Sequence, residues 1–196
     1  MGLWPSIAGK VRLDGADVYT WNKQQLGPHV GYLPQGVELF EGSLAENIAR
    51  FDVPDPAKVE AAAKAVGLHE LIQAMPERYD TQIGDSGAIL SGGQRQRVGL
   101  ARAIYGKPAF VVLDEPNSSL DEQGDAALAD VISRLAAQGT TFVVITHRTS
   151  VLGVSNKMLV LRDGQAQIFG PRDDVLKALN EAAAKARQPA TVAATN

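Results

Sequence analysis

The sequence predicts an α/β fold around a parallel sheet, and three stretches carry this prediction. Residues 110–113 form a short run of β-branched, aromatic and leucine side chains without alternation, which is typical of a strand buried on both faces of a parallel sheet. Residues 141–146 have the same character. Between these runs, residues 126–137 carry apolar side chains at helical spacing, so a helix should connect the two strands.

Shorter elements are expected on either side of this unit. Residues 10–15 alternate and end in an Asp-Gly turn signal, and residues 29–33 form another short apolar run. The Asp-Gly pair at 163–164 separates two β-rich runs, a pattern that predicts a hairpin with a type I′ turn. A short helix is expected over residues 173–179. Residues 181–196 begin Ala-rich and then lose any pattern, so a frayed helix that continues into a disordered tail is expected there.

Residues 42–105 are expected to be mainly helical. Ser43 is followed three residues later by Glu46, the pattern of a capping box. Pro56 can open an Ala-rich helix. Ser91 suits the N-cap of a further helix that ends near residue 105.

Composition excludes several classes of protein. The 196 residues contain 45% hydrophobic side chains, enough for one core with a subdomain. With 19 basic and 22 acidic residues the net charge is -3, so nucleic acid is not expected as a partner. The chain has no cysteine, which excludes disulfides and thiolate metal sites. No apolar stretch approaches the ~20 residues of a membrane span, and the first residues do not resemble a signal peptide.

The Gly-rich opening at Ser91, Gly92, Gly93 and Gln94 is a candidate anion site. The two glycines leave the amides of the first helical turn uncovered, and such amides bind phosphate and other anions. Gln94 adds a side-chain donor beside them. For a motif this short, an ordinary capped helix is the more frequent explanation.

Two acids and a histidine follow the two expected parallel strands. Asp114 and Glu115 stand at the end of the first strand and His147 at the end of the second, where open α/β sheets place their ligand crevice. An Asp in this position can hold Mg²⁺, and a neighbouring Glu can take a proton from an attacking water. Alternatively, the acids are two solvated side chains in a turn, and the histidine is structural.

The motifs together resemble the ATP-binding-cassette (ABC) ATPase family. LSGGQ at residues 90–94, then a helix, LDEP at 113–116 and SSLD at 118–121 follow the family's order of signature, Walker B motif and D-loop, and the resemblance extends from about residue 3 to 179. The phrase YLPQGVELFEGSLAENI resembles the Q-loop region of exporters, and GPRDDVLKAL resembles the end of type I protein-secretion ATPases.

The resemblance implies a RecA-like P-loop NTPase core with an inserted ABC helical subdomain. Residues 1–41 would belong to the core up to the Q-loop, residues 42–105 to the helical subdomain, and residues 106–180 to the rest of the core. Residues 181–196 would lie outside it as the disordered tail.

The resemblance also implies a role for each candidate residue, with ATP as substrate and Mg²⁺ as cofactor. Glu115 would be the catalytic base, His147 would bond the γ-phosphate, and Asp114 and Gln35 would serve Mg²⁺. The signature and the D-loop would contact ATP held by an opposing chain; their residues are Ser91, Gly92, Gly93, Gln94 and Asp121.

One family motif, the Walker A or P-loop sequence G-x-x-x-x-G-K-[ST], is not found. Gly9-Lys10 is followed by Val, and Gly106-Lys107 by Pro. The resemblance therefore implies a chain that begins after the P-loop and lacks the first core strands. Such a chain is expected to bind ATP poorly by itself. The missing strand is expected beside the Walker B strand, and its loss to leave unpaired edges in the sheet, an aggregation hazard.

The favoured hypothesis is an ATP-hydrolysing subunit fragment of an ABC exporter for type I protein secretion. Its partners would be a second ABC domain, a transmembrane domain, a periplasmic adaptor and an outer-membrane channel, at the cytoplasmic face of a bacterial inner membrane. One alternative is a catalytically incompetent partner that donates only its signature. Another is a soluble ABC protein of translation or DNA repair, which the exporter-like phrases at residues 32–48 disfavour.

Overall fold

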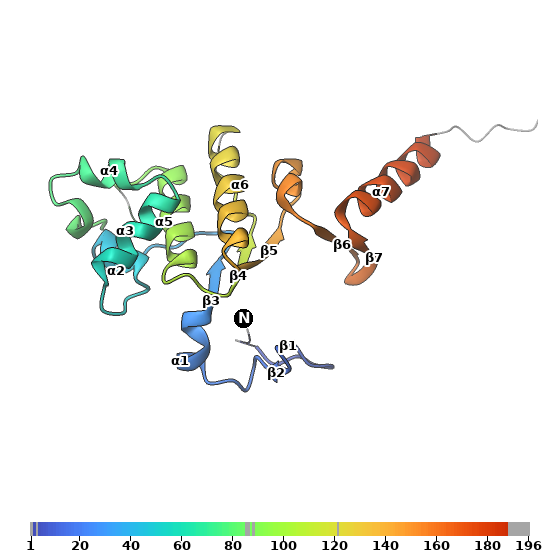
Figure 1. The fold of residues 1–196 in the computed structure, drawn as a ribbon, viewed down its shortest axis with the longest axis horizontal. Coiled ribbons are helices and arrows are strands. Elements are labelled where there is room, and N and C mark those ends of the chain that lie inside the picture. Colours follow the sequence, from blue (N-terminus) through green and yellow to red (C-terminus); the bar gives the residue numbers. More distant parts are fainter. Residues whose placement is uncertain (1, 3, 85–86, 88, 121, 188–196) are drawn as a thin grey trace, which may run out of the picture. The chain divides into compact units, whose positions relative to one another are not determined.

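The computed structural model describes residues 2, 4–84, 87, 89–120 and 122–187 (Figure 1). The chain divides into two compact units, Met1–Val151 and Leu152–Asn196, and each is described by itself. The elements of the first unit are β1 (Arg12–Leu13), β2 (Ala16–Asp17), α1 (Lys23–Leu26), η1 (Gly27–His29), β3 (Val30–Leu33), α2 (Leu44–Ile48), α3 (Pro56–Ala65), α4 (His69–Gln73), η2 (Arg78–Asp80), α5 (Gly92–Ile104), β4 (Phe110–Asp114), α6 (Glu122–Ala137) and β5 (Thr141–Ile145).

A parallel three-stranded sheet of order β3-β4-β5 lies at the centre of the first unit (Figure 1). The register pairs Leu33 with Leu113 and Leu113 with Val144. The predicted α/β class with parallel strands is therefore confirmed. Since β4 already has a neighbour on each side, the expectation that the missing strand lies beside it is wrong, whereas the expected unpaired edges are found at β3 and β5 among the described residues. A further strand can pair only with the outer edge of β3 or of β5.

The two faces of the sheet differ in burial, which corrects the prediction of strands buried on both faces. Leu33, Val111 and Leu113 on one face are fully buried. On the other face Val143 is 42% exposed and Ile145 is 50% exposed. Apolar and polar residues do not alternate along these strands because both faces of the sheet carry apolar side chains.

Helix α5 packs directly on β3, and Gly31 makes this approach possible. A Cβ atom built on Gly31 would lie 1.9 Å from the carbonyl oxygen of Ala103 in α5, far inside van der Waals contact. Gly99 on the helix is similarly tight, since its Cβ would lie 2.8 Å from the side chain of Leu33. A glycine on the strand and a glycine on the helix therefore allow α5 to pack closely on the sheet.

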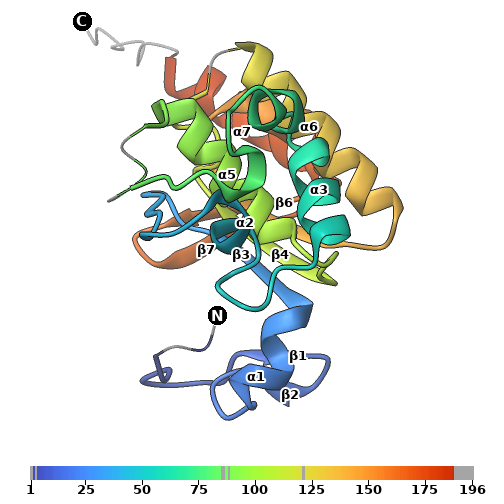
Figure 2. The same cartoon turned by 90° about the vertical axis from the view of Figure 1, so that its left-hand side faces the viewer.

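The helical part follows the predicted caps. Ser43 and Glu46 form a complete capping box at the start of α2, and Asp55 caps α3 with Pro56 in the first turn. Figure 2 shows α2 and α3 beside α5, in agreement with their contacts. The apolar core here includes the fully buried side chains of Leu44, Ile48, Val59, Leu68, Ile72 and Ile83.

Arg50, directly after α2, connects this helical part to the sheet. Its guanidinium donates to five backbone carbonyls, which are those of Gly27 (2.8 Å), Val30 (3.1 Å), Arg102 (3.0 Å), Ala103 (3.1 Å) and Tyr105 (3.4 Å). Five is the full donor capacity of an arginine. Burial lowers the pKa of Arg50. Arg50 and Phe51 both have left-handed backbones, with φ of 63° and 61°, a conformation that costs non-glycine residues energy.

A second arginine, Arg102 in α5, makes a similar connection. It donates to the carbonyl oxygen of Glu38 at 2.9 Å, and to the carbonyl and side-chain oxygens of Asn47, both at 2.8 Å. The segment after β3, helix α2 and helix α5 are therefore joined at one point.

The N-terminal strand is shorter than predicted. The alternating residues 10–15 form only β1, which pairs antiparallel with β2 around a tight turn. Asp14 and Gly15 in the turn have positive φ values of 49° and 83°, as their turn signal predicts.

The second unit is a hairpin followed by a helix. Strands β6 (Lys157–Arg162) and β7 (Gln165–Pro171) pair antiparallel. Asp163 and Gly164 between them both have positive φ, which confirms the predicted type I′ turn. Helix α7 (Arg172–Arg187) is longer than the predicted 173–179, so residues 181–187, expected in a disordered tail, are helical. Residues 188–196 lie outside the described part.

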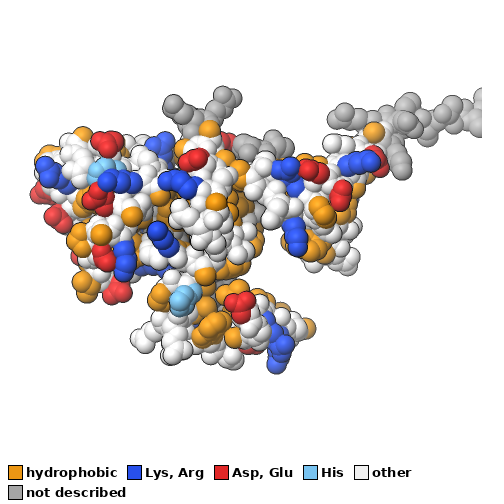
Figure 3. Space-filling model, viewed as in Figure 1, with side chains coloured by type: hydrophobic (Ala, Val, Ile, Leu, Met, Phe, Trp, Pro, Cys, Tyr) orange, Lys and Arg blue, Asp and Glu red, His pale blue; other side chains and the backbone are white. Residues whose placement is uncertain are grey.

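The surface carries charges of both signs. On the face shown in Figure 3, acidic and basic side chains are interspersed over the helical part of the first unit, in agreement with the near balance in composition. Within the described ranges no helix is long and apolar enough to cross a membrane.

Candidate functional site

Glu115 occupies a strained position at the carboxyl end of the sheet. It follows Asp114, the last residue of β4, and its backbone N–H donates to the carbonyl oxygen of Ile145 in β5 at 2.8 Å. Its φ of 47° is left-handed, and such conformations in non-glycine residues cluster at functional sites. The chain thus turns sharply as it leaves the sheet.

His147 and Glu115 are in direct contact, as their expected location at one sheet edge implies. His147 Nδ1 lies 2.9 Å from Glu115 Oε1. The histidine side chain is 78% exposed, whereas the Glu115 side chain is 16% exposed. The second carboxylate oxygen, Oε2, is buried without a hydrogen-bond partner among the described residues. A buried oxygen of this kind needs a donor, so the site is suited to a water or another donor at Oε2.

The Gly-rich opening begins α5 as predicted. The Ser91 hydroxyl accepts from the Gln94 N–H at 3.3 Å, and Gln94 Oε1 accepts from the Ser91 N–H at 2.8 Å. The Gln94 oxygen therefore completes a capping box, and the expected donor role of its side-chain nitrogen stays a prediction. Gly92 is exposed and Gly93 is half-buried, so neither glycine lies in the core.

The structure says less about two other predicted site residues, Gln35 and Asp121. Gln35 is exposed, two positions beyond the end of β3, and it therefore lies at the same sheet edge as Asp114. No hydrogen bond joins it to Asp114 or Glu115 in the described part of the chain. Asp121 lies outside the described residues.

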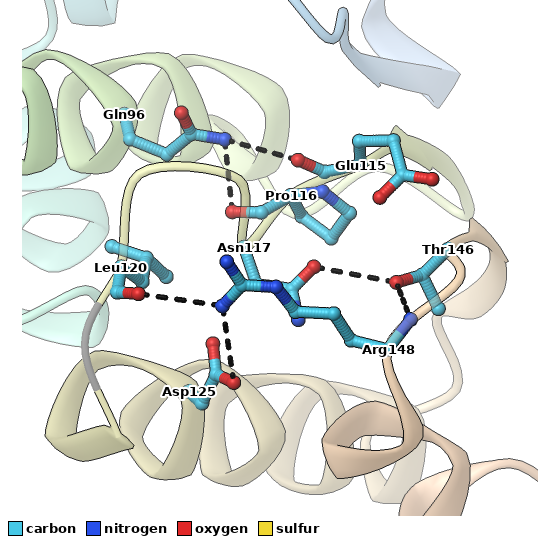
Figure 4. Close-up of polar contacts among 8 residues, drawn as sticks. All are labelled: Gln96, Glu115, Pro116, Asn117, Leu120, Asp125, Thr146 and Arg148. Atoms are coloured by element: carbon cyan, nitrogen blue, oxygen red, sulfur yellow. Dashed lines mark hydrogen bonds and ion pairs between the residues drawn. The ribbon is translucent and has the colours of Figure 1, made fainter.

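A polar network that the sequence did not predict surrounds Glu115 (Figure 4). From α5, Gln96 Nε2 donates to the carbonyl oxygens of Pro116 at 2.9 Å and Glu115 at 3.5 Å. Thr146 Oγ1 donates to Asn117 Oδ1 at 3.3 Å and accepts from the Arg148 N–H at 3.0 Å. These contacts join the loop after β4 both to α5 and to the segment after β5.

Arg148 extends this network toward α6. Its Nη1 lies 3.4 Å from the carbonyl oxygen of Leu120 and 3.8 Å from Asp125 Oδ2. The only sequence signal for these residues is their location beside the predicted motifs. Nothing in composition or spacing distinguishes a buried glutamine on α5 from its neighbours.

The sequence profile of the ABC transporter family matches residues 1–118. The chain belongs to the ABC transporter family. The profile thus covers β3, β4 and α5 together with Glu115, and it agrees with the fold class predicted from the motifs.

Relatives among ABC transporters include proteins of several kinds. The chain is 51% identical over 178 residues to the type I secretion system ATP-binding protein PrsD of Rhizobium meliloti (strain 1021), covering 90% of this chain and 30% of that protein. It is 37% identical over 169 residues to the ATP-dependent lipid A-core flippase of Burkholderia orbicola (strain AU 1054), covering 86% and 28%. It is 39% identical over 158 residues to the human ATP-binding cassette sub-family B member 6, covering 80% and 19%.

The fold of a solved ABC transporter agrees with these relationships. The structure of a bacterial Atm1-family ABC exporter with ATP bound is similar with a TM-score of 0.80 at 30% sequence identity, covering 94% of this chain and 33% of that chain. The chain thus spans a third or less of the length of these relatives.

Proposed function

We propose that this chain is part of the ATP-binding and ATP-hydrolysing domain of an ABC exporter, and that the exporter serves type I protein secretion. The contact between Glu115 and His147 at the carboxyl end of the sheet is the structural observation that supports hydrolysis. The 51% identity to PrsD supports secretion.

Glu115 has the features of a general base. His147 occupies its Oε1 atom, while Oε2 is buried and has no partner within the described ranges. Oε2 is therefore the oxygen that would accept a proton from a water attacking the γ-phosphate of ATP. Proton transfer to a positioned carboxylate typically contributes about 10²–10⁴-fold to a rate.

His147 would hold Glu115 and the γ-phosphate at once only when its ring is doubly protonated. Its Nδ1 faces the acceptor Oε1, so in the neutral ring the proton is on Nδ1 and Nε2 can only accept. The imidazolium form donates from both nitrogens. The exposed ring can approach a bound γ-phosphate.

Mg²⁺ fits the donors available at this edge. No group of three or more His, Cys, Asp or Glu residues that could hold a metal is found among the described residues, and Mg²⁺ is commonly bound by one or two protein groups together with phosphate oxygens and waters. Asp114 and Gln35 would hold it. When bound, Mg²⁺ neutralises charge on the phosphates.

The start of α5 would serve a second ABC domain. The exposed Gly92 and the capped first turn with Ser91, Gly93 and Gln94 would bind the phosphates held by that domain, with Asp121 alongside. A transmembrane domain, a periplasmic adaptor and an outer-membrane channel would complete the exporter at the cytoplasmic face of a bacterial inner membrane.

The test is a hybrid subunit in which this chain replaces the matching segment of PrsD. We expect the hybrid to hydrolyse ATP. The Glu115→Gln variant should lose at least 100-fold in kcat and keep its ATP affinity, whereas Glu77→Gln, an exposed acid outside the site, should hydrolyse normally. A hybrid that folds but does not hydrolyse ATP, or an unaffected Glu115→Gln variant, would refute the proposal.

A second candidate function is a partner that donates only its signature. The observation in its favour is that the first turn of α5 is capped by Ser91 and keeps Gly92 exposed, as a donated signature requires. If this is the function, mixing the chain with an intact ABC domain should raise that domain's hydrolysis. The increase should persist in Glu115→Gln and disappear in Ser91→Ala.

A further inference from the structure

Gln96 is a buried polar residue whose side chain joins α5 to the loop after β4. It is 4% exposed, and its Nε2 donates to the carbonyl oxygens of Pro116 at 2.9 Å and Glu115 at 3.5 Å (Figure 4). Neither carbonyl belongs to α5, so the helix does not require these bonds for its own stability.

The two contacted carbonyls both lie on the carboxyl side of the strained Glu115. On its amino side Glu115 is fixed by its N–H bond to Ile145, and on its carboxyl side Gln96 holds the peptide groups that follow. Pro116 is buried, and a buried carbonyl that loses its donor is costly. Because Glu115 has a left-handed φ of 47°, the loop needs contacts of this kind to keep that conformation.

The first turn of the same helix also contacts this loop. A Cβ atom on Gly93 would lie 3.5 Å from the carbonyl oxygen of Ser119, and one on Gly92 would lie 3.9 Å from Ser119 Cβ. Residues three and four apart share a helix face, so Gly92, Gly93 and Gln96 lie along the side of α5 that faces the loop. A displacement of the first turn therefore reaches Gln96 through one rigid helix.

We propose that Gln96 is a positioning residue that couples the signature end of α5 to the carboxylate of Glu115. The inference rests on the proposed function, since the signature would contact a nucleotide held by another domain while Glu115 acts on the nucleotide of its own. Gln96 thereby links two nucleotide sites within one chain. Closure of one site on the signature sets the position of the base in the other.

The first test measures hydrogen exchange in this chain. Gln96→Met keeps the length of the side chain and removes its donors. We expect about tenfold faster exchange at the amides of Glu115, Ser118 and Leu120, with α3 unchanged. Arg97→Met, at the next position on α5 and without a hydrogen bond or ion pair in the described part, is the matched control and should exchange like the wild type. Unchanged exchange at the three amides in Gln96→Met would overturn the proposal.

The second test is kinetic and uses the PrsD hybrid. A positioning role predicts a fall in kcat of about 5- to 20-fold for Gln96→Met with KM for ATP within twofold. Removing an interaction that acts only in the transition state lowers kcat and leaves KM unchanged. Gln96→Glu should show the same defect at pH 8 and recover part of it, relative to the wild type, at pH 6. Burial at this position raises the pKa of the introduced carboxyl, so more of it is protonated at pH 6 than at pH 8, and the protonated form can again donate to Pro116.

The outcomes separate this inference from the proposed function. An active hybrid in which Gln96→Met has a wild-type kcat would overturn the role of Gln96 and leave the proposed function intact. A rise in KM as large as the fall in kcat, or a Gln96→Glu defect that does not depend on pH, would show that Gln96 has a structural effect only and would overturn its positioning role. A folded hybrid without hydrolysis would refute the proposed function and the kinetic role together.

Discussion

Arg50, which follows α2, should contribute more to stability than any salt bridge among the described residues. In Arg50→Met the side chain remains apolar and of similar length, but five backbone carbonyls lose their donor. Three of these belong to Arg102, Ala103 and Tyr105 at the carboxyl-terminal end of α5, where a positive charge also interacts favourably with the helix dipole.

The magnitude follows from the number of bonds that water cannot replace. Arg50 is half-buried, so water can reach some of the freed carbonyls. Counting about three bonds at a net ~1 kcal/mol each gives a loss of about 3 kcal/mol. For a chain of this size 1 kcal/mol corresponds to roughly 2–4 °C, so the melting temperature should fall by about 6–12 °C.

The assay is thermal unfolding followed by circular dichroism. Arg50→Lys should fall between the wild type and Arg50→Met, because an ammonium has three donors and cannot reach all five carbonyls. Arg97→Met is again the control, with an expected change within about 1 °C. If Arg50→Met melts within 1 °C of the wild type, the carbonyls are satisfied by water alone and the reasoning is wrong.

Three further predictions use other parts of the chain. Gly31→Ala should lower the urea midpoint strongly, because its Cβ would lie 1.9 Å from a carbonyl oxygen of α5, whereas Gly36→Ala meets nothing within 4 Å and should unfold like the wild type. The pKa of Glu46 is lowered from 4.5 by its hydrogen bonds to the Ser43 backbone N–H and hydroxyl. Its carboxylate therefore stabilises the fold above the unfolded pKa, and this stability is lost as pH falls through the lower folded pKa. A stability gap between wild type and Glu46→Gln that stayed constant from pH 6 to pH 3 would contradict this assignment. His147→Ala should leave the melting temperature within about 1 °C, since a mainly exposed side chain contributes little, and should lower kcat in the PrsD hybrid; normal hydrolysis would exclude a role in the reaction.

Local sequence signals predicted the elements of this chain well. The capping boxes at Ser43 and Ser91 and the turn at residues 163–164 are encoded by a few neighbouring side chains, so each can be recognised without tertiary information. The parallel strands β4 and β5 were recognisable from their continuous apolar character, and their common edge brought Glu115 and His147 together as expected.

Long-range features escaped prediction for a physical reason. The five bonds of Arg50 connect positions as far as 55 residues apart, and no pattern around residue 50 encodes them. The exposure of Val143 depends on what covers the sheet, which the strand's own residues do not specify. Helix α7 extends past residue 179 because its Ala-rich end favours helix, which agrees with the frayed helix expected there but not with a tail that begins at residue 181.

The exposed apolar face of the sheet should affect the solubility of this chain. Val143 and Ile145 form an exposed apolar strip on β5, whose outer edge has no strand partner among the described residues. Tyr32 is exposed on the same face, but it lies on β3 at the opposite edge of the sheet. At high concentration, copies of the chain can associate through this strip. Salts that are excluded from the protein surface, such as sulfate, strengthen apolar contacts of this kind. Ammonium sulfate should therefore turn a clear solution of this chain cloudy sooner than a solution of a Val143→Lys variant.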